Sequence, residues 1–296
     1  MGFADVLTSP FMVRSLIAAV LVGLAAPVVG TYLVHRRLAM LGDGIGHVSL
    51  TGVALGWLIG STLGLVPNDQ LAIPGAIVAA IVGSVAIELV RRSGSASADV
   101  ALAILFYGGI AGGVLIMGLA GGTSAQLNSY LFGSIATVSW LDIVLIGALG
   151  IVILATGIGL LPALFSVCND EGFAASTGLP VPKLSMLLAV LSALTVAISM
   201  RVVGALLVSA LMVVPVAIAQ LFSRSFRQTM LVAMGTGTIL CIAGLLITAA
   251  VDLSPGGMIV VLAILLYGIT FAFHHYRRRL QRNPHRQETF EAGQRP

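Results

Sequence analysis

The sequence predicts an all-α, polytopic membrane protein with about nine transmembrane helices. Of its 296 residues, 58% are hydrophobic and only 9% are charged, and the mean hydropathy is +1.08. A soluble domain needs far more charged residues to cover its surface. The apolar residues also fall in runs of roughly 20, the length that an α-helix needs to cross the hydrocarbon core of a bilayer.

Nine apolar runs follow one another along the chain, and turn or charge signals separate them. The breaks read "VPND", "RRSGS", "AGGTS", "CNDEG", "FSRSFR" and "DLSPGG", and residues of these types interrupt helices. The predicted spans are 13–34, 38–60, 72–90, 99–119, 140–163, 184–200, 203–222, 229–250 and 256–275.

The runs predict one membrane domain over 1–276, followed by a polar cytoplasmic tail over 277–296. The first run has no basic segment before it beyond Arg14, and His35, Arg36 and Arg37 follow it at once. We therefore expect a retained helix rather than a cleaved signal peptide.

The positive charges predict the orientation of the chain, because cytoplasmic loops carry an excess of Lys and Arg. With the N-terminus outside, Arg14 and Arg201 are outside and the other 13 of the 15 Lys and Arg residues are cytoplasmic. We expect a multi-pass protein of the cell membrane with its C-terminus in the cytoplasm. At the inner end of the third run, Glu88 precedes Arg91 and Arg92 by one helical turn and is expected to pair with them.

Several functions are excluded by missing motifs. A P-loop needs a lysine followed by Ser or Thr, whereas the single lysine, Lys183, follows Pro182 and precedes Leu184. The HExxH motif of zinc proteases and the GxSxG motif of hydrolases are also missing. The net charge of +4 is scattered in short clusters between the runs, so it indicates membrane topology and not nucleic-acid binding. The chain is therefore not expected to be an enzyme.

One ionisable pair falls inside a predicted span, in "LGDGIGHVSL". Asp43 and His47 lie four residues apart and share one face of a helix. Ionisable groups within a membrane are costly and usually face a partner or a water-filled path. Carboxylate oxygen and imidazole nitrogen are ligands for zinc and manganese. Gly42, Gly44 and Gly46 flank the pair and keep that helix wall thin.

The spacing of Asp43 and His47 leaves three readings open. The pair is a transient metal site on a translocation path, a structural hydrogen bond or ion pair between packed helices, or part of a proton relay. Spacing is compatible with each of them.

Four separated stretches give a more specific indication. "RRLAMLGDGIGHVSLTGVALGWLIG" at 36–60 resembles the signature of the permease family of ABC-type zinc and manganese importers. The resemblance continues in "YLFGSIATVSWLD" at 130–142, "VVGALLVSALMVVPVAIAQL" at 202–221 and "DLSPGGMIVVLA" at 252–263. It covers nearly the whole chain, in the right order.

The resemblance implies a permease fold and a set of partners. Such permeases form homodimers with the translocation path near the interface, a separate cytoplasmic ATP-binding subunit supplies energy, and an extracytoplasmic metal-binding protein delivers the ion. Asp43 and His47 match the family's intramembrane Asp and His, which line the metal path. No cofactor is expected to stay bound, since the zinc or manganese ion is the cargo.

The longest polar break on the inner side, 164–183, is expected to be the cytoplasmic coupling segment. It is predicted to form a short helix that seats in the ATP-binding subunit, with Asp170, Glu171, Phe173 and Gly178 as the coupling residues. Phe173 is the expected apolar plug and Gly178 the expected helix end. The family commonly has "DPEFA" or "DEEFA" here, whereas this chain has "DEGFA", with Gly172 at the position of the second acidic residue.

The resemblance thus predicts the membrane subunit of an ABC importer, for zinc first, manganese second and iron third. The alternative is a self-sufficient secondary metal-ion transporter. That class needs a coupling-ion site and commonly shows internal repeats, while the sequence shows no obvious repeat and one ionisable pair at depth.

Overall fold

The computed structural model describes residues 9–67, 69–93, 98–133, 138–205, 207–251 and 253–282, and these parts of the chain form helices joined by short connections. The helices are α2 (Pro10–His35), α3 (Leu41–Thr62), α4 (Ala72–Ser93), α5 (Ala98–Leu119), α6 (Ser124–Phe132), α7 (Trp140–Gly159), α8 (Leu161–Asn169), α9 (Glu171–Ser176), α10 (Val181–Val203), α11 (Val208–Gln220), α12 (Phe226–Ala250) and α13 (Pro255–Arg282).

The predicted all-α, polytopic membrane fold is confirmed. Within the described residues, eight helices are long and apolar enough to cross a membrane, and α11 is a shorter apolar helix. The run at 203–222 was predicted as a full span, but its helix covers only Val208–Gln220. At 1.5 Å per residue, these 13 residues extend about 20 Å, less than the ~30 Å hydrocarbon core.

Two other predicted spans end more than three residues away from their helices, and the remaining boundaries differ by three residues or fewer. The span at 140–163 ends at Gly159, and α8 begins at Leu161, because Pro162 at the second position of α8 starts a new helix more readily than it continues one. α13 runs to Arg282, six residues into the predicted tail over 277–296, while residues 283–296 lie outside the described parts of the chain.

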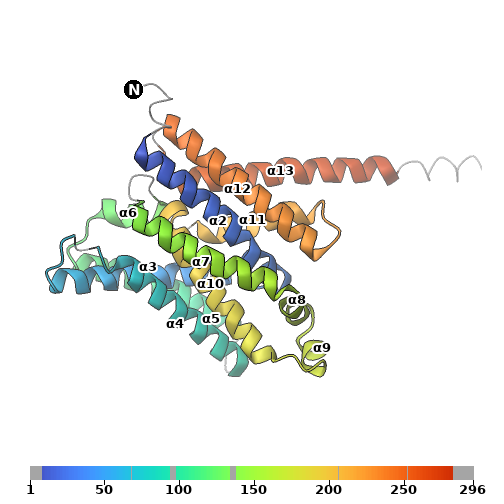
Figure 1. The fold of residues 1–296 in the computed structure, drawn as a ribbon, viewed down its shortest axis with the longest axis horizontal. Coiled ribbons are helices and arrows are strands. Elements are labelled where there is room, and N and C mark those ends of the chain that lie inside the picture. The colour runs from blue at the N-terminus through green and yellow to red at the C-terminus, as the bar shows by residue number, and fades with distance from the viewer. Residues whose placement is uncertain are drawn as a thin grey trace, which may run out of the picture.

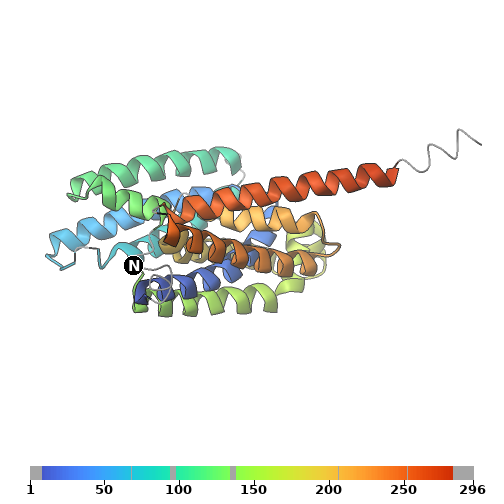
Figure 2. The same cartoon turned by 90° about the horizontal axis from the view of Figure 1, so that it is seen from above.

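The helices pack as a bundle in which α2 and α10 are central. α2 packs against α7, α10, α11 and α12, and α3 packs against α4 and α5. α5 and α7 lie at opposite edges of the bundle, and α13 extends past its other helices (Figures 1 and 2). Long apolar side chains on the outward faces, such as Leu115 on α5 and Val144 on α7, are exposed, as expected for helices that face lipid.

The bundle has two distinct ends. At the end we call the charged end, the last turns of α2 and α4 lie beside α9 and the first turn of α10, because Arg36 pairs with Glu171 and Arg92 bonds the Pro182 carbonyl. At the opposite end, which we call the α6 end, the amide of Ala205 donates to the carbonyl of Tyr130 at 2.9 Å. α10 therefore begins at the charged end and ends at the α6 end.

The turn from α2 to α3 has a fixed geometry. The amide of Leu38 donates to the carbonyl of Leu33 at 2.8 Å, and the amide of Arg37 donates to the carbonyl of Val34 at 3.1 Å. This is the Schellman pattern of a helix C-terminus, and Arg37 takes the left-handed position with φ 59°, where glycine is usual. The turn places Asp43 only two residues beyond the start of α3.

Candidate functional site

Asp43 and His47 lie one turn apart at the start of α3, as predicted. Oδ1 of Asp43 is 3.9 Å from Nε2 of His47. This distance is too long for a hydrogen bond, so the two groups are neighbours without a direct bond.

A third polar residue, Ser209, reaches the pair from α11. Its hydroxyl donates to Oδ1 of Asp43 at 3.2 Å. Ser209 is in the first turn of the short helix α11, whose N-cap, Leu207, offers no side-chain acceptor. The contact therefore connects the start of α3 to the start of α11.

His47 is buried without a hydrogen-bond partner. Its exposed fraction is 1%, and neither ring nitrogen has a partner among the described residues. The ring of Phe106 packs edge-on against it, with 4.2 Å between the centroids. A buried polar group left unsatisfied costs roughly 1–3 kcal/mol, and His47 carries this cost in the isolated chain.

Close backbone contacts hold α3 in place around the pair. A Cβ atom on Gly109 of α5 would stand 2.6 Å from the carbonyl carbon of His47, and one on Gly46 would stand 2.7 Å from the carbonyl oxygen of Ala205. Only glycine allows helices to approach this closely. One turn beyond His47, the Thr51 hydroxyl donates to the Gly109 carbonyl at 2.7 Å, so it bonds α5 and is not free for a ligand.

A cavity of about 410 Å³ opens beside Asp43. Its walls come from the first turn of α3 and from α5, and the lining residues are Met40, Asp43, Gly44, Leu102, Ala103, Phe106 and Tyr107. The side chain of Asp43 is 28% exposed, whereas His47 lies behind Phe106. Asp43 is therefore the member of the pair that is open to the cavity.

The pair supplies two ligands from one chain. Within the described ranges, no group of three or more His, Cys, Asp and Glu side chains comes together. Zinc usually takes four ligands, so Asp43 and His47 by themselves supply too few for a complete zinc site.

The predicted coupling residues lie at the charged end, on and around α9. Asp170 is the N-cap of this six-residue helix, and its Oδ1 accepts from the Phe173 amide at 3.0 Å. The Phe173 side chain is 62% exposed. Gly178 follows the helix with φ 82°, a conformation that glycine adopts without steric cost.

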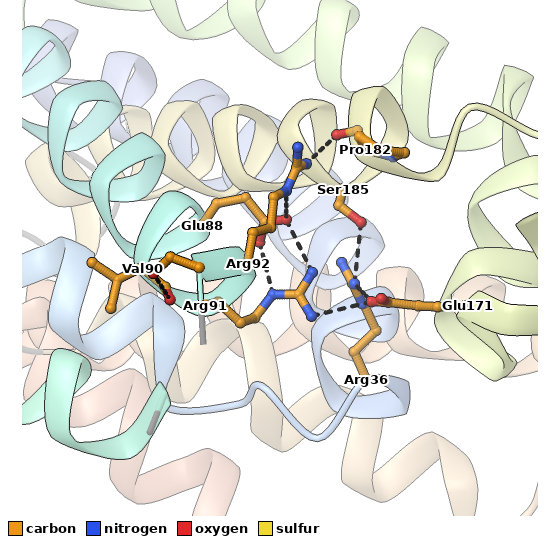
Figure 3. Close-up of polar contacts among 9 residues, drawn as sticks. Arg36, Glu88, Val90, Arg91, Arg92, Glu171, Pro182 and Ser185 are labelled. Carbon is orange, nitrogen blue, oxygen red and sulfur yellow. Dashed lines mark hydrogen bonds and ion pairs between the residues drawn. The ribbon is translucent and has the colours of Figure 1, made fainter. Parts of the chain in front are cut away.

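Glu171 belongs to a cluster of charged residues that Figure 3 shows in close-up. It contacts Arg36 of α2 and, at 3.2 Å, Nη1 of Arg91 of α4. Glu88 accepts from Arg91 at 2.9 Å and from Arg92 at 2.8 Å, which confirms the predicted local pairing. Glu171 therefore faces the protein's own arginines.

The charged end also has a polar cavity of about 370 Å³ beside α8, lined by His35, Arg36, Arg37, Phe165, Cys168 and Asn169. Burial raises the pKa of the Cys168 thiol to about 12. The thiol is therefore protonated at neutral pH and is a poor nucleophile.

Sequence reasoning missed Ser209, Phe106 and the partners of Glu171. Ser209 carried a weak signal, as a polar residue in the apolar run "VVGALLVSALMVVP". Phe106 carried none, because an aromatic residue in an apolar run is ordinary. The partners of Glu171 come from α2 and α4, and no local pattern links them.

Comparisons with known proteins identify the family and the fold. A model described as the ABC 3 transport family matches residues 8–274. The chain is 29% identical over 271 residues to the manganese transport system membrane protein MntC of Halalkalibacterium halodurans, covering 92% of this chain and 90% of that protein. It is also 29% identical over 253 residues to the high-affinity zinc uptake system membrane protein ZnuB of Haemophilus influenzae, covering 86% and 94%. The solved structure of PsaBC from Streptococcus pneumoniae in complex with Fab has a TM-score of 0.80 and 30% identity, covering 91% of this chain and 94% of that one.

Proposed function

Because the chain belongs to the ABC 3 transport family, we propose that it is the membrane-spanning subunit of an ATP-driven importer of a divalent transition metal ion. ATP is hydrolysed by a separate subunit, since permeases of ABC transporters do not carry the nucleotide site. The family membership removes the alternative of a self-sufficient secondary transporter. An extracytoplasmic metal-binding protein completes the system.

The proposal about the transported ion rests on His47. Its ring is 1% exposed, both nitrogens lack a hydrogen-bond partner among the described residues, and the Asp43 carboxylate is 3.9 Å away. A neutral imidazole and a carboxylate are donors for zinc and manganese. A permanent Asp–His hydrogen bond would use one ring nitrogen, whereas the observed distance leaves both for an ion.

For the transported ion, the proposal places zinc first and manganese second. One oxygen and one nitrogen donor bind zinc more tightly than manganese in raw affinity. Of the two relatives described above, one is named as part of a manganese transport system and the other as part of a zinc uptake system. Competition between labelled zinc and manganese in the same uptake assay tests this order directly, and preferred manganese uptake would reverse it.

We further propose that the transporter contains two copies of this chain, facing each other across α5. The cavity beside Asp43 opens along α5, where Tyr107 is 70% exposed and Gly108 has no neighbour within 4 Å of a Cβ position. A second copy on this face would cover the cavity and bring two Asp–His pairs near one path. Four good ligands would hold the ion too tightly for transport, so the pairs engage in only one gating state.

The orientation is proposed with the charged end in the cytoplasm, from the excess of Lys and Arg there. The exposed Phe173 on α9 then faces the ATP-binding subunit and seats in it. Asp170 supports this position by capping α9, and Gly178 allows the chain to turn back toward α10.

The test is metal uptake by cells that lack their own zinc and manganese importers and receive this chain with its partner subunits. Asp43→Asn keeps the size of the side chain without its charge, and His47→Ala removes both nitrogens. Each is expected to abolish uptake per folded molecule. Thr270→Val is the matched control, because this hydroxyl bonds only carbonyls of its own helix, α13.

A purely structural role for the pair predicts a different pattern. Both variants would then express poorly, while the folded fraction would still transport. Near-normal uptake per folded molecule in Asp43→Asn and His47→Ala contradicts the proposal.

A further inference from the structure

Glu171 turns toward the bundle and contacts two helices at once. Its Oε1 accepts from a guanidinium nitrogen of Arg36, at the end of α2, and from Nη1 of Arg91 of α4 at 3.2 Å (Figure 3). Arg36 also donates to the hydroxyl of Ser185 on α10 at 3.2 Å. One carboxylate on α9 thus lies where α2, α4 and α10 meet.

A second carboxylate fixes the arginines in place. Glu88 is buried, with 6% of its side chain exposed, and accepts from both Nε and Nη2 of Arg91 at 2.9 Å. It also accepts from Arg92, which bonds the Pro182 carbonyl at the start of α10. The bidentate contact fixes the plane of the Arg91 guanidinium, so its remaining nitrogen is presented to Glu171.

The two carboxylates differ in how readily their contacts break. Glu88 is buried between two arginines, and removing a partner from such a pair is strongly destabilising. The Glu171 side chain is 44% exposed, and ion pairs in contact with water contribute little and exchange easily. The contact between α9 and the bundle is thus the weaker one, suited to forming and breaking within a transport cycle.

α9 has two faces with different chemistry. Glu171 and Phe173 are two residues apart, and such residues do not share a face of an α-helix. Glu171 faces the arginines, while Phe173 is 62% exposed. Asp170 uses Oδ1 to cap the amide of Phe173. Both acidic residues of "DEGFA" therefore contact this chain itself, and Phe173 remains for a partner.

We propose that Arg36 and Arg91 are positioning residues that hold the coupling helix α9 to α2 and α4 through Glu171. This inference rests on the proposed function, in which the ATP-binding subunit moves α9. Arg36 directly precedes the Schellman turn at Arg37, and α3 with Asp43 begins five residues after Arg36. A displacement of α9 is passed through Glu171 to this turn and from there to the metal site.

The experiment uses the complete transporter in proteoliposomes, with this chain, its ATP-binding subunit and its metal-loaded binding protein. The variants are Glu171→Gln, Arg36→Gln and the double variant. Arg37→Gln is the matched control, because it loses the same charge one residue away and its exposed side chain has no partner among the described residues. The readouts are the number of manganese or zinc ions imported per ATP hydrolysed and the amount of ATP-binding subunit that co-purifies.

Each single variant is expected to lower the number of ions imported per ATP about fivefold, the scale of one partly exposed ion pair. The ATP-binding subunit should still co-purify through Phe173. The double variant should be no worse than Glu171→Gln, because loss of the Glu171 charge already removes its ion pair with Arg36, and losses that act through one contact are not additive. Arg37→Gln should match the wild type.

Two results overturn the inference. An unchanged ratio of ions to ATP in Glu171→Gln means that the contact does not transmit movement. Additive losses in the double variant mean that Glu171 contacts the ATP-binding subunit directly. Glu171→Ala, at a side chain that is 44% exposed, leaves both arginines in place and covers the case in which Arg36→Gln does not fold; it should lower the ratio of ions to ATP as Glu171→Gln does. A wild-type complex that imports no metal contradicts the proposed function, which is a separate outcome.

Discussion

The backbone of His47 lies directly against Gly109 of α5. A Cβ atom at position 109 would stand 2.6 Å from the His47 carbonyl carbon and 2.8 Å from its oxygen. Backbone atoms cannot move aside as a flexible side chain can. The position of α3, and with it that of the proposed metal site, therefore depends on the absence of a side chain at position 109.

Gly109→Ala is expected to separate α3 from α5 and to lower both metal uptake and thermal stability. Overpacking of this kind costs about 1–3 kcal/mol, which corresponds to a fall of several degrees in the unfolding temperature of the purified protein. Gly118→Ala on the same helix is the control, since a Cβ atom there has nothing within 4 Å. Equal unfolding temperatures and equal uptake for the two variants would show that the close approach is not needed.

Ser209→Ala is expected to raise the metal concentration needed for half-maximal uptake. The variant removes the hydroxyl that donates to Asp43 at 3.2 Å, so the carboxylate is no longer held in one orientation. A hydrogen bond to a charged, partly exposed group contributes ~1 kcal/mol, or about fivefold in affinity.

Ser209→Thr keeps the hydroxyl and should restore most of that affinity. The wild type and the two variants are compared by measuring uptake in cells as a function of metal concentration. Identical curves for the alanine and threonine variants would assign Ser209 to packing alone.

Phe173→Asp is expected to weaken binding of the ATP-binding subunit while the permease stays folded, because the side chain is exposed in the isolated chain. Loss of a central aromatic contact from an interface typically costs about 2 kcal/mol, or roughly thirtyfold in affinity. Co-purification from detergent gives the measurement. Ser176→Asp adds the same charge at the exposed end of α9 and should bind more tightly than Phe173→Asp. Normal binding by Phe173→Asp would locate the docking contact elsewhere.

Cysteines introduced at chosen positions should report the orientation of the chain in the membrane, because the two native cysteines should react little with maleimide. Both native cysteines are buried, and burial raises the pKa of Cys168 to about 12. The Cys168 thiol is therefore protonated at pH 7, and its reactive thiolate form increases only as the pH is raised toward the pKa. The wild-type protein should therefore take up little maleimide at neutral pH.

In intact cells, an impermeant maleimide should label Gln70→Cys, at the α6 end. It should label Ser176→Cys, on α9, only after the membrane is opened. Labelling of position 176 in intact cells would reverse the proposed orientation.

Much of the fold could be predicted from local patterns in the sequence. A membrane span depends on the length and apolarity of one segment, so eight of the nine predicted spans are helices of spanning length. Asp43 and His47, and Glu88 with its arginines, lie one helical turn apart, and helix geometry alone brings such residues together.

The rest depends on contacts between distant segments. Ser209 is 166 residues from Asp43, and Glu171 is 135 residues from Arg36. The length of the seventh predicted span, 203–222, differs from that of its helix, Val208–Gln220, for a related reason. Apolarity continues unbroken through 203–222, but the chain bends at Gly204, which has φ 92°. The carbonyl of Tyr130 stabilises the bend by accepting a hydrogen bond from the amide of Ala205. The hydropathy of the segment does not predict that contact.

The bend at Gly204 also bears on how the protein is assembled during synthesis. Gly256, in the first turn of α13, lies against the carbonyl oxygens of Val203 and Phe132, so close that a Cβ atom would collide with both. α13 is synthesised after the segment whose bend it contacts. Until α13 is made, the backbone at this bend lacks that contact. A chain that stops before Pro255 lacks it as well, so the bend at Gly204 reaches its observed packing only after α13 has been synthesised.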